Sequence, residues 1–335
     1  MTDVHSNLDR VVALTRGFRT AQATYVIAKL GLADELAGGP ATAAELARKV
    51  SVNPEALARV LRLAAFCELV TELPGDRFEL TELGNLLRDG VEGSIRATAI
   101  MLGEEHYTAW GSLLYSVRTG KPAFDHVFGS PFFDYMAKNA DAQATFDAAM
   151  SSGSDVYLAS LADAYDFRGR TLVDVGGGNG SLSAIILKRH PQLEAVIYDQ
   201  PQVLEAADRY LTEAGVRERC SLVPGNFFES VPDGGDVYFL SNILHDWDDE
   251  RAIQVLKNCR AAMNPSAVVL LLEAVVPEHG TPSAAALYDV NMLVLLTGKE
   301  RTQTQFESLL RAAGLGLHKV TPVSKTESLL EARPL

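Results

Sequence analysis

The chain has 335 residues, of which 47% are apolar and 22% charged, so it is long enough for two domains with substantial hydrophobic cores. Its formal net charge is −13 at pH 7. Residues 1–100 hold 13 acidic and 11 basic side chains and contribute only −2 of that charge. Neither part of the chain offers the basic face that a polyanion requires, which argues against a nucleic acid as partner.

Cysteine spacing and hydropathy both indicate a cytoplasmic protein. Cys67, Cys220 and Cys259 lie far apart in apolar segments, without the spacing of a zinc site or a redox motif, so we expect reduced core thiols. The first ten residues are polar and acidic, and the longest apolar runs have strand length. We therefore expect no contact with a membrane.

The first hundred residues are predicted to form short helices. An apolar pattern of helical spacing runs up to Gly31, which ends the first helix. Thr42 and Glu45 have the spacing of a capping box that opens a second helix. Asn53 caps a third helix, with Pro54 at its first position.

Two short alternating runs, 69–73 and 77–80, flank a Pro-Gly-Asp turn and predict a hairpin. Residues 1–100 are therefore expected to form an all-helical, winged-helix-like domain whose only strands are this wing. Such a module binds DNA or forms a dimer, and the balanced charge and apolar first helix favour the dimer. A small basic set keeps the DNA alternative open: Arg48, Lys49, Arg59 and Arg62.

Residues 101–165 are predicted to be a helical linker that contributes to a substrate pocket. The segment is rich in aromatic and histidine side chains, some of which we expect in the core and some along a cleft. They are His106, Tyr107, Trp110, Phe124, Phe128, Phe132, Phe133, Tyr135, Phe146 and Tyr157.

Residues 166–335 alternate β-type runs with helical segments, which predicts a Rossmann-like α/β domain with a seven-stranded sheet covered on both faces. The last two runs have no helix between them, so we expect an antiparallel pair at the sheet edge. The predicted strands are Thr171–Val175, Ala195–Tyr198, Cys220–Val223, Val237–Leu240, Ala267–Leu272, Leu317–Val320 and Ser328–Ala332.

A glycine-rich loop follows the first of these strands and precedes a helix. Gly176, Gly178 and Gly180 permit a tight turn and a close approach of a ligand to the backbone. A dinucleotide fingerprint would require a third glycine where Ser181 stands. The observed Gly-x-Gly-x-Gly, with Asp174 two residues ahead, is the form found in enzymes that bind S-adenosyl-L-methionine.

Two further loops at the ends of strands are candidates for cofactor binding. Asp199 stands 25 residues after Asp174, where a carboxylate can accept both ribose hydroxyls, although a helix cap or turn acid is the alternative. Asn226 and Phe227 follow the third strand, where they could offer a hydrogen-bond partner and an apolar wall to an adenine.

His245 is the only one of seven histidines that is predicted to lie at the carboxyl end of a strand beside the glycine loop. A neutral histidine, with a pKa of about 6.5, can accept the proton of a phenol with a pKa of about 10 as a methyl group is transferred. General-base catalysis of this kind contributes roughly 10²–10⁴ in rate.

Such a base requires an acceptor on its other ring nitrogen, and two glutamates qualify. Glu273 ends a strand neighbouring that of His245, which favours it over Glu300. Glu300 is alternatively an acid at the start of a helix over 303–313. Asp246 is a candidate cap for the helix that begins near Asp249, and we expect no metal site among these acids.

These residues together resemble the caffeate/acetylserotonin-type (class I) small-molecule O-methyltransferases, in their bacterial natural-product branch, over nearly the whole chain. The most specific matching segments are Asp174–Gly180, His245-Asp-Trp247 and Gly298-Lys-Glu-Arg-Thr302, supported by Phe146-x-x-x-Met150 and Asp289–Leu293.

The resemblance implies methylation of a hydroxyl on a small aromatic molecule, such as a polyketide phenol or a phenazine, by a homodimer that swaps N-terminal helices. It implies His245 as the base, flanked by Glu273 and Glu300, with Asp246 near the reacting group. The implied cofactor contacts are Asp174, Gly176, Gly178, Asp199, Asn226, Phe227, Ser241, Phe146 and Met150. The implied acceptor pocket contains His106, Trp110, Asn291, Met292 and Leu295.

Two positions depart from the plant members of that family, which usually have aspartate at Asn226 and lysine at Ser241. Asn226 lacks the charge, and Ser241 lacks a cation for the methionine carboxylate. Three alternatives stay open: a same-fold enzyme that uses the cofactor without methyl transfer, a cofactor-sensing DNA regulator, and a nicotinamide oxidoreductase. The presence of His245 with both glutamates favours methyl transfer.

Overall fold

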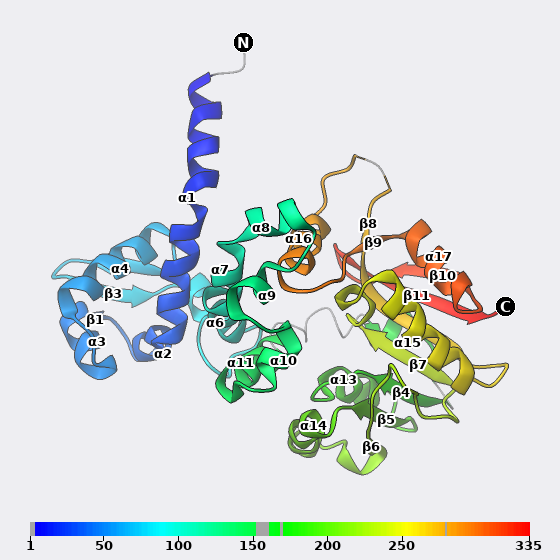
Figure 1. Cartoon of the computed structure of the whole chain (residues 1–335). Helices are drawn as coiled ribbons and strands as arrows, with labels where there is room; N and C mark the ends of the chain where they lie inside the picture. Colours follow the sequence, from blue (N-terminus) through cyan, green and yellow to red (C-terminus); the bar gives the residue numbers. More distant parts are fainter. Residues whose placement is uncertain (1–3, 152–160, 168–169, 279) are drawn as a thin grey trace. The chain divides into compact units, whose positions relative to one another are not determined.

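The computed structural model describes residues 4–151, 161–167, 170–278 and 280–335, and it divides the chain into two compact units (Figure 1). The first unit consists of residues 1–108 and 136–154, and the second of residues 109–135 and 155–335.

The first unit contains helices and one small antiparallel sheet. Its strands, in the order β1-β3-β2, are β1 (Ala41–Thr42), β2 (Val70–Leu73) and β3 (Arg77–Leu80). Its helices are α1 (Val4–Lys29), α2 (Leu32–Leu36), α3 (Ala43–Val50), α4 (Pro54–Phe66), α5 (Glu82–Asn85), α6 (Arg96–Gly103) and α11 (Ala140–Ser151), while α7 (Glu105–Trp110) spans the boundary with the second unit.

The capping residues and the hairpin that the sequence predicts are confirmed. Thr42 Oγ1 accepts the Glu45 backbone N–H at 3.2 Å, and Asn53 Oδ1 accepts the N–H of Ala56 at 2.9 Å. Strands β2 and β3 pair antiparallel. The description as all-helical apart from the wing was wrong in one respect, because β1 adds a third strand to β3. A two-residue strand carries no alternation from which it could be predicted.

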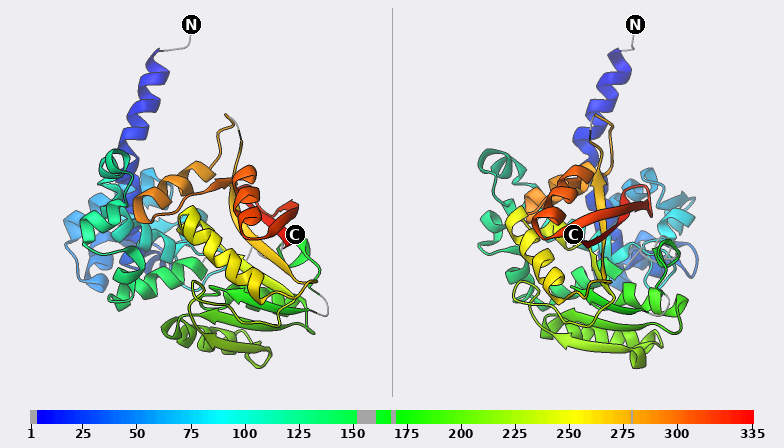
Figure 2. Two further views of the ribbon diagram at one scale, coloured as in Figure 1. Left: turned by 45° about the vertical axis from the view of Figure 1, so that its right-hand side comes forward. Right: turned by 90° about the vertical axis from the view of Figure 1, so that its right-hand side faces the viewer.

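The first part of α1 carries an exposed apolar stripe. This part of the helix extends beyond the other helices of its unit (Figure 2). Four large apolar side chains there are 52–81% exposed: Leu8, Val11, Leu14 and Phe18. Near its carboxyl end the helix enters the core of the unit, where Ile27 and Ala28 are fully buried. An apolar stripe of this size on a helix is a typical surface for a partner.

The second unit is built on a twisted sheet with the strand order β10-β11-β8-β7-β4-β5-β6. The last five strands in this order, from β8 to β6, run parallel to one another. These strands are β4 (Thr171–Val175), β5 (Glu194–Asp199), β6 (Cys220–Pro224), β7 (Val237–Ser241) and β8 (Val268–Val276). The antiparallel pair expected at the edge is confirmed as β10 (Leu315–Pro322) and β11 (Glu327–Pro334).

Helices cover both faces of this sheet, as the buried β runs predict. One core contains α15 (Asp249–Ala262) and α17 (Gln303–Ala312), packed on Tyr238 and Leu240 of β7. The opposite core contains α13 (Ser181–Arg189) and α14 (Pro201–Glu213), packed on Val237 and Phe239 of the same strand. Other helices described in this unit are α8 (Leu113–Thr119), α9 (Ala123–Phe128), α16 (Ala285–Leu295), η1 (Arg217–Arg219) and η2 (Leu244–Asp246), and α10 (Phe132–Met136) crosses the boundary.

Two features of the sheet differ from prediction. β8 continues to Val276, so Glu273 lies within the strand and not at its end. The cause is β11, which pairs Ser328 with Glu273 and thereby extends the ladder. In addition, β9 (Arg301–Thr302) pairs in parallel with the end of β8.

The aromatic segment supplies core packing within the second unit. Phe124 is fully buried, and its ring lies 4.4–5.4 Å from those of Phe128, Phe132 and Tyr135. Tyr157 lies outside the described residues. The cysteines are free, with Cys220 and Cys259 buried and Cys67 half-buried. None of the described helices is both long and apolar enough to span a membrane.

Candidate active site

The glycine loop between β4 and α13 adopts backbone conformations that favour glycine. Gly176, Gly178 and Gly180 have φ values of 74°, 56° and 76°. A Cβ on Gly176 would lie 2.5 Å from the Ile243 side chain, whereas the space beside Gly178 is open to 4 Å. The loop therefore packs tightly against the end of β7 on one side and leaves room for a ligand on the other.

Asp174 supports this loop from the interior. It is 2% exposed, and its Oδ2 accepts the Ser183 hydroxyl at 2.6 Å. Burial raises the pKa of its carboxyl to about 7, against the lowering effect of the Ser183 hydrogen bond.

Asp199 at the end of β5 is joined to the glycine loop. Its Oδ2 accepts the Gly178 N–H at 2.9 Å, and its Oδ1 accepts the N–H of Gln200 at 2.7 Å. The structure thus brings together the two elements that the sequence assigns to the cofactor. The half-buried carboxylate lies beside the open space at Gly178.

The loop after β6 places an aromatic ring over the glycine loop. A Cβ on Gly176 would lie 3.6 Å from Phe227 Cε1. Phe227 also faces the Trp247 ring at 6.3 Å, and Trp247 stacks on Phe133 at 5.8 Å. Asn226 is exposed, and it bonds the Phe228 N–H and the Glu229 carboxylate within its own turn.

His245 lies in η2, directly after β7, within a group of carboxylates. Its Nδ1 is 2.8 Å from Glu300 Oε1 and 4.0 Å from Glu273 Oε2. Its Nε2 is 3.3 Å from Asp246 Oδ1. The preference for Glu273 as the partner of Nδ1 was therefore wrong, because Glu300 makes this hydrogen bond.

Strand geometry explains the reversal. Glu273 lies inside β8, and its Oε1 accepts the Leu244 N–H at 2.8 Å, so it anchors the backbone beside His245. Glu300 precedes α17, whose N-cap is Thr302 in a capping box with Gln305, so the reading as a helix acid was also wrong. The Glu300 N–H donates to Asp289 Oδ1 at 3.0 Å, which fixes this loop.

The acids that follow His245 have roles other than the expected ones. Asp248 caps α15 by accepting the Arg251 N–H at 2.9 Å, so the prediction of Asp246 as the cap was wrong. Asp246 is directed toward His245 because the chain forms a 3₁₀ turn before the helix begins.

The carboxylates change the acid–base properties of the site. Burial lowers the pKa of His245, but Asp246, the hydrogen bond to Glu300 and the charge of Glu273 outweigh it and raise the pKa to about 10. Burial raises the pKa of Glu273 to about 7 and that of Asp246 to about 6. The group is thus built to hold one positive charge at the imidazole.

Two more residues lie at this sheet edge, and no sequence pattern predicts them there. Asn242, with a φ of 52°, donates its side-chain N–H to Glu327 Oε1 at 3.3 Å. Burial raises the pKa of Glu327, and the charge of His245 acts in the opposite direction to lower it. Glu327 begins β11 opposite Ala274, and only the antiparallel register places it here.

The predicted acceptor residues, and the predicted cofactor contacts Ser241, Phe146 and Met150, are divided between the two units. In the second, Trp110 Nε1 donates to Asn291 Oδ1 at 2.9 Å, and Met292 and Leu295 on the same helix are buried. Ser241 ends β7 and is half-buried. His106, Phe146 and Met150 belong to the first unit, where His106 is buried and Met150 is 52% exposed. Their part in the site stays a prediction.

The chain matches two family models, an O-methyltransferase dimerisation domain over residues 12–89 and an O-methyltransferase domain over residues 110–316. It is 42% identical over 326 residues to the phenazine O-methyltransferase PhzM of Lysobacter antibioticus, covering 97% of this chain and 96% of the relative. The 8-amino-8-demethylriboflavin N,N-dimethyltransferase of Streptomyces davaonensis is 36% identical over 321 residues, covering 94% and 92%.

Solved structures agree with these matches. The crystal structure of LaPhzM superposes with a TM-score of 0.95 at 42% identity, covering 98% of this chain and 99% of that one. The O-methyltransferase NcsB1 from neocarzinostatin biosynthesis, solved with S-adenosylmethionine and 2-hydroxy-5-methyl naphthoic acid, gives 0.84 at 33% identity and covers 94% and 96%. The chain belongs to the S-adenosylmethionine-dependent small-molecule O-methyltransferases that carry an N-terminal dimerisation domain.

Proposed function

We propose that the protein transfers a methyl group from S-adenosylmethionine to a phenolic hydroxyl on a planar aromatic natural product, with His245 as the general base. The observation that carries this proposal is the 2.8 Å hydrogen bond between His245 Nδ1 and Glu300 at the carboxyl end of the sheet. In its neutral form, an imidazole held in this way presents Nε2, which lies 3.3 Å from Asp246 Oδ1, to the proton of the acceptor.

The residues around the glycine loop fit the cofactor. The open space at Gly178 lies beside the Asp199 carboxylate, which suits ribose hydroxyls, and Phe227 offers an apolar wall to the adenine. Asn226 would exchange its bond with Glu229 to reach the adenine. Ser241 would contact the methionine part of the cofactor. Asp174 would support the glycine loop from the protein interior through its hydrogen bond with Ser183.

S-adenosylmethionine, when bound, supplies an electrophilic methyl group and a neutral thioether as leaving group. His245 Nε2 would accept the hydroxyl proton as the oxygen forms its bond to that carbon. Glu300 holds Nδ1–H and stabilises the imidazolium that results, and Asp246 lies 3.3 Å from Nε2, near the reacting group. Glu273 keeps the His245 backbone in place through Leu244.

The acceptor residues that we propose are Trp110, Asn291, Met292 and Leu295 of the second unit. An indole ring bonded to an amide at 2.9 Å offers a flat apolar surface with a polar edge. A phenazine-sized hydroxyarene is the acceptor class that we infer, since the relative at 42% identity is a phenazine O-methyltransferase.

Because one relative methylates nitrogen, the acceptor atom needs a direct test. A hydroxyphenazine and the corresponding aminophenazine would be compared for S-adenosylhomocysteine release. We expect release with the hydroxyl compound and little with the amine. Release with the amine alone would identify an N-methyltransferase, while product formation with the cofactor returned unchanged would identify non-methylating chemistry.

His245, Glu273 and Glu300 could also meet a metal ion, since one ligand atom of each lies within 4.8 Å of the others. We propose a metal-free mechanism, because His245 Nδ1, the ring atom that faces both glutamates, bonds Glu300 Oε1, and Glu273 Oε1 bonds the Leu244 N–H. Methyl transfer that survives dialysis against EDTA supports this proposal, and loss that Mg²⁺ or Zn²⁺ restores would overturn it.

We further propose a homodimer formed through residues 1–100, with 101–165 as a linker and 166–335 as the cofactor-binding domain. The exposed stripe Leu8, Val11, Leu14 and Phe18 supports this arrangement, as does the match to a dimerisation domain. The net charge of −13 disfavours a nucleic-acid partner, and the free cysteines fit a cytoplasmic enzyme.

A further inference from the structure

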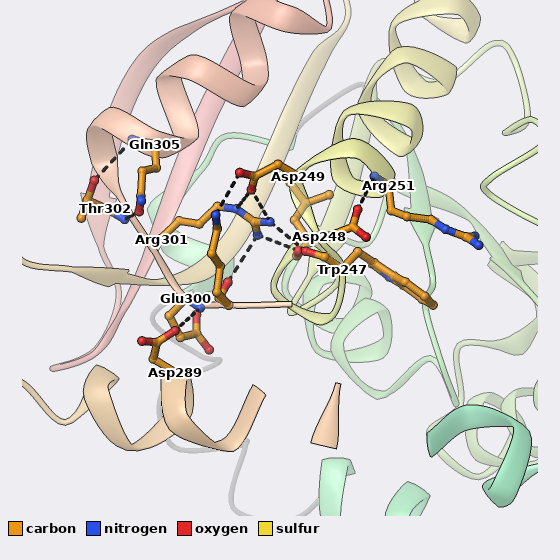
Figure 3. Close-up of polar contacts among 11 residues, drawn as sticks. Trp247, Asp248, Asp249, Arg251, Asp289, Glu300, Arg301, Thr302 and Gln305 are labelled. Atoms are coloured by element: carbon orange, nitrogen blue, oxygen red, sulfur yellow. Dashed lines mark hydrogen bonds and ion pairs between the residues drawn. The ribbon is translucent and has the colours of Figure 1, made fainter. Parts of the chain in front are cut away.

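Arg301 in β9 is fully buried, and its guanidinium lies beside Trp247 and Asp249 (Figure 3). Its Nη1 donates to the Leu244 carbonyl at 2.8 Å and to the Lys299 carbonyl at 3.3 Å. Its Nη2 donates to the Trp247 carbonyl at 2.8 Å. Its charge is balanced by Asp249, whose Oδ1 accepts Nε at 3.0 Å and Nη2 at 2.9 Å.

Two of these carbonyls bracket the candidate catalytic segment. Leu244 and Trp247 are the residues directly before and after the pair His245–Asp246. Leu244 is also held from its amide side, because its N–H donates to Glu273 at 2.8 Å. The 3₁₀ turn that carries the imidazole is therefore fixed at both ends by buried charged groups.

The same loop that supplies Arg301 supplies the imidazole's partner. Glu300 is the preceding residue, and its N–H is held by Asp289 (Figure 3). Gly298 lies against the His245 backbone, so that a Cβ there would fall 1.8 Å from the His245 carbonyl oxygen. The loop 298–301 and the segment 244–247 thus contact each other through backbone, and the Arg301 guanidinium donates hydrogen bonds to carbonyl groups of both.

A buried arginine that only stabilised the fold would need partners for its charge and its five N–H groups, but those partners could lie anywhere. Here the partners are the two ends of one turn, the loop that carries Glu300, and the first residue of α15. A planar fork with several donors can fix such an arrangement, whereas a single ammonium cannot reach all of these acceptors.

We propose that Arg301 is a positioning residue that holds the His245 imidazole against Glu300 by fixing the Leu244–Trp247 turn to the 298–301 loop. This inference rests on the proposed role of His245 as the base. Arg301 itself touches neither cofactor nor acceptor in this account.

The test compares Arg301→Lys and Arg301→Met with Lys299→Met as the matched control. Lys299 donates to Asp249 Oδ2 at 2.9 Å, so its variant loses one charge and one bond to the same carboxylate but none to the catalytic turn. The first readout is the titration of the His245 ring followed by NMR in cofactor-free protein, assigned with His245→Gln. The second is kcat together with the calorimetric Kd for S-adenosylmethionine.

We expect Arg301→Met to shift the His245 titration toward lower pH by about one unit or more, because the Glu300 contact that raises the pKa is loosened. A displacement of about 1 Å in a catalytic group costs on the order of 10²-fold, so kcat should fall by about that factor while Kd changes little. Arg301→Lys should lie between, and Lys299→Met should match the wild type.

A folded Arg301→Met protein with the wild-type His245 titration and kcat would overturn the proposal. If that variant does not fold, Arg301→Lys and Gly298→Ala, which disturbs the same contact from the other loop, are judged by the same titration. A wild-type titration in both would overturn it as well. The NMR readout needs no turnover, so failure of the protein to methylate any acceptor would contradict the proposed function and leave the positioning result to stand alone.

Discussion

At the scale of single residues, the site assembles several acids around one imidazole. Residue types and strand order placed His245, Glu273 and Glu300 at the same sheet edge, but they could not determine which glutamate bonds Nδ1. That depends on a difference between 2.8 Å and 4.0 Å, set by the length of β8 and the course of the loop before α17. Glu327 could not be predicted at all, because only the register of β11 brings it there.

The pH dependence of catalysis should follow the His245 imidazole. Its pKa in the folded protein is raised to about 10, so at neutral pH the base is mostly protonated in the free enzyme. We predict that kcat/KM increases about tenfold per pH unit between pH 7 and 9 and levels off near pH 10. A profile measured with saturating cofactor checks this, and a plateau already reached at pH 7 would contradict it.

The same shift predicts a contribution to stability. The folded protein binds this proton more tightly than the unfolded chain, so the stabilisation is complete below pH 6.5 and disappears as pH rises through about 10. His245→Gln should therefore lose less stability than the wild type between pH 7 and 10, as measured by urea unfolding. Parallel pH curves for the two proteins would count against the raised pKa.

The two glutamates should differ on substitution. Glu300→Gln removes the charge from the side chain bonded to Nδ1, and we expect kcat to fall on the order of 10²-fold. Glu273→Gln keeps an oxygen acceptor for the Leu244 N–H, and its effect on kcat should be about tenfold smaller. Single-turnover kinetics would measure both variants, and equal losses would remove the distinction between the two roles.

At the scale of elements, periodicity and capping residues predicted most of the fold. Local sequence patterns predicted three features that the structure contains: the capping box at Thr42, the cap at Asn53 and the glycine loop. The two-residue strands β1 and β9 and the extension of β8 have none, since they form only through pairing with distant segments. The predicted cap at Asp246 was wrong because a 3₁₀ turn intervenes before α15.

The glycine loop offers a matched pair of variants. Gly176→Ala would combine a φ of 74° with a Cβ 2.5 Å from Ile243, so we expect a loss of several degrees in Tm together with weaker cofactor binding. Gly178→Ala meets nothing within 4 Å, so it should cost only backbone strain of about 1–3 kcal/mol. Equal losses of Tm in the two variants would contradict the packing described for Gly176.

At the scale of the whole molecule, the first unit presents apolar residues that a single chain leaves exposed. Leu14 is 81% exposed on α1, with Leu8, Val11 and Phe18 along the same helix. Buried in a second copy, such a stripe would stabilise association by roughly 25 cal/mol per Å² of apolar surface removed from water. We therefore propose that the first unit acts by burying this stripe in a dimer.

Leu14→Glu should weaken this dimer. A carboxylate placed in an apolar interface has to be desolvated, so we expect a predominantly monomeric protein in sedimentation velocity runs at micromolar concentration. Leu335→Glu, at a position that is 76% exposed at the other end of the chain, serves as the control and should leave the oligomeric state unchanged. A dimer of wild-type stability in Leu14→Glu would move the interface away from the stripe on α1.

The measurement that tests the central claim most directly is S-adenosylhomocysteine release from a hydroxyphenazine by wild type and His245→Ala, with the cofactor Kd measured by calorimetry on the same samples. We predict an unchanged Kd and a loss in kcat of roughly 10²–10⁴, the usual contribution of a general base. Turnover by His245→Ala at the wild-type rate would contradict the account, because the imidazole held by Glu300 would then not be the base.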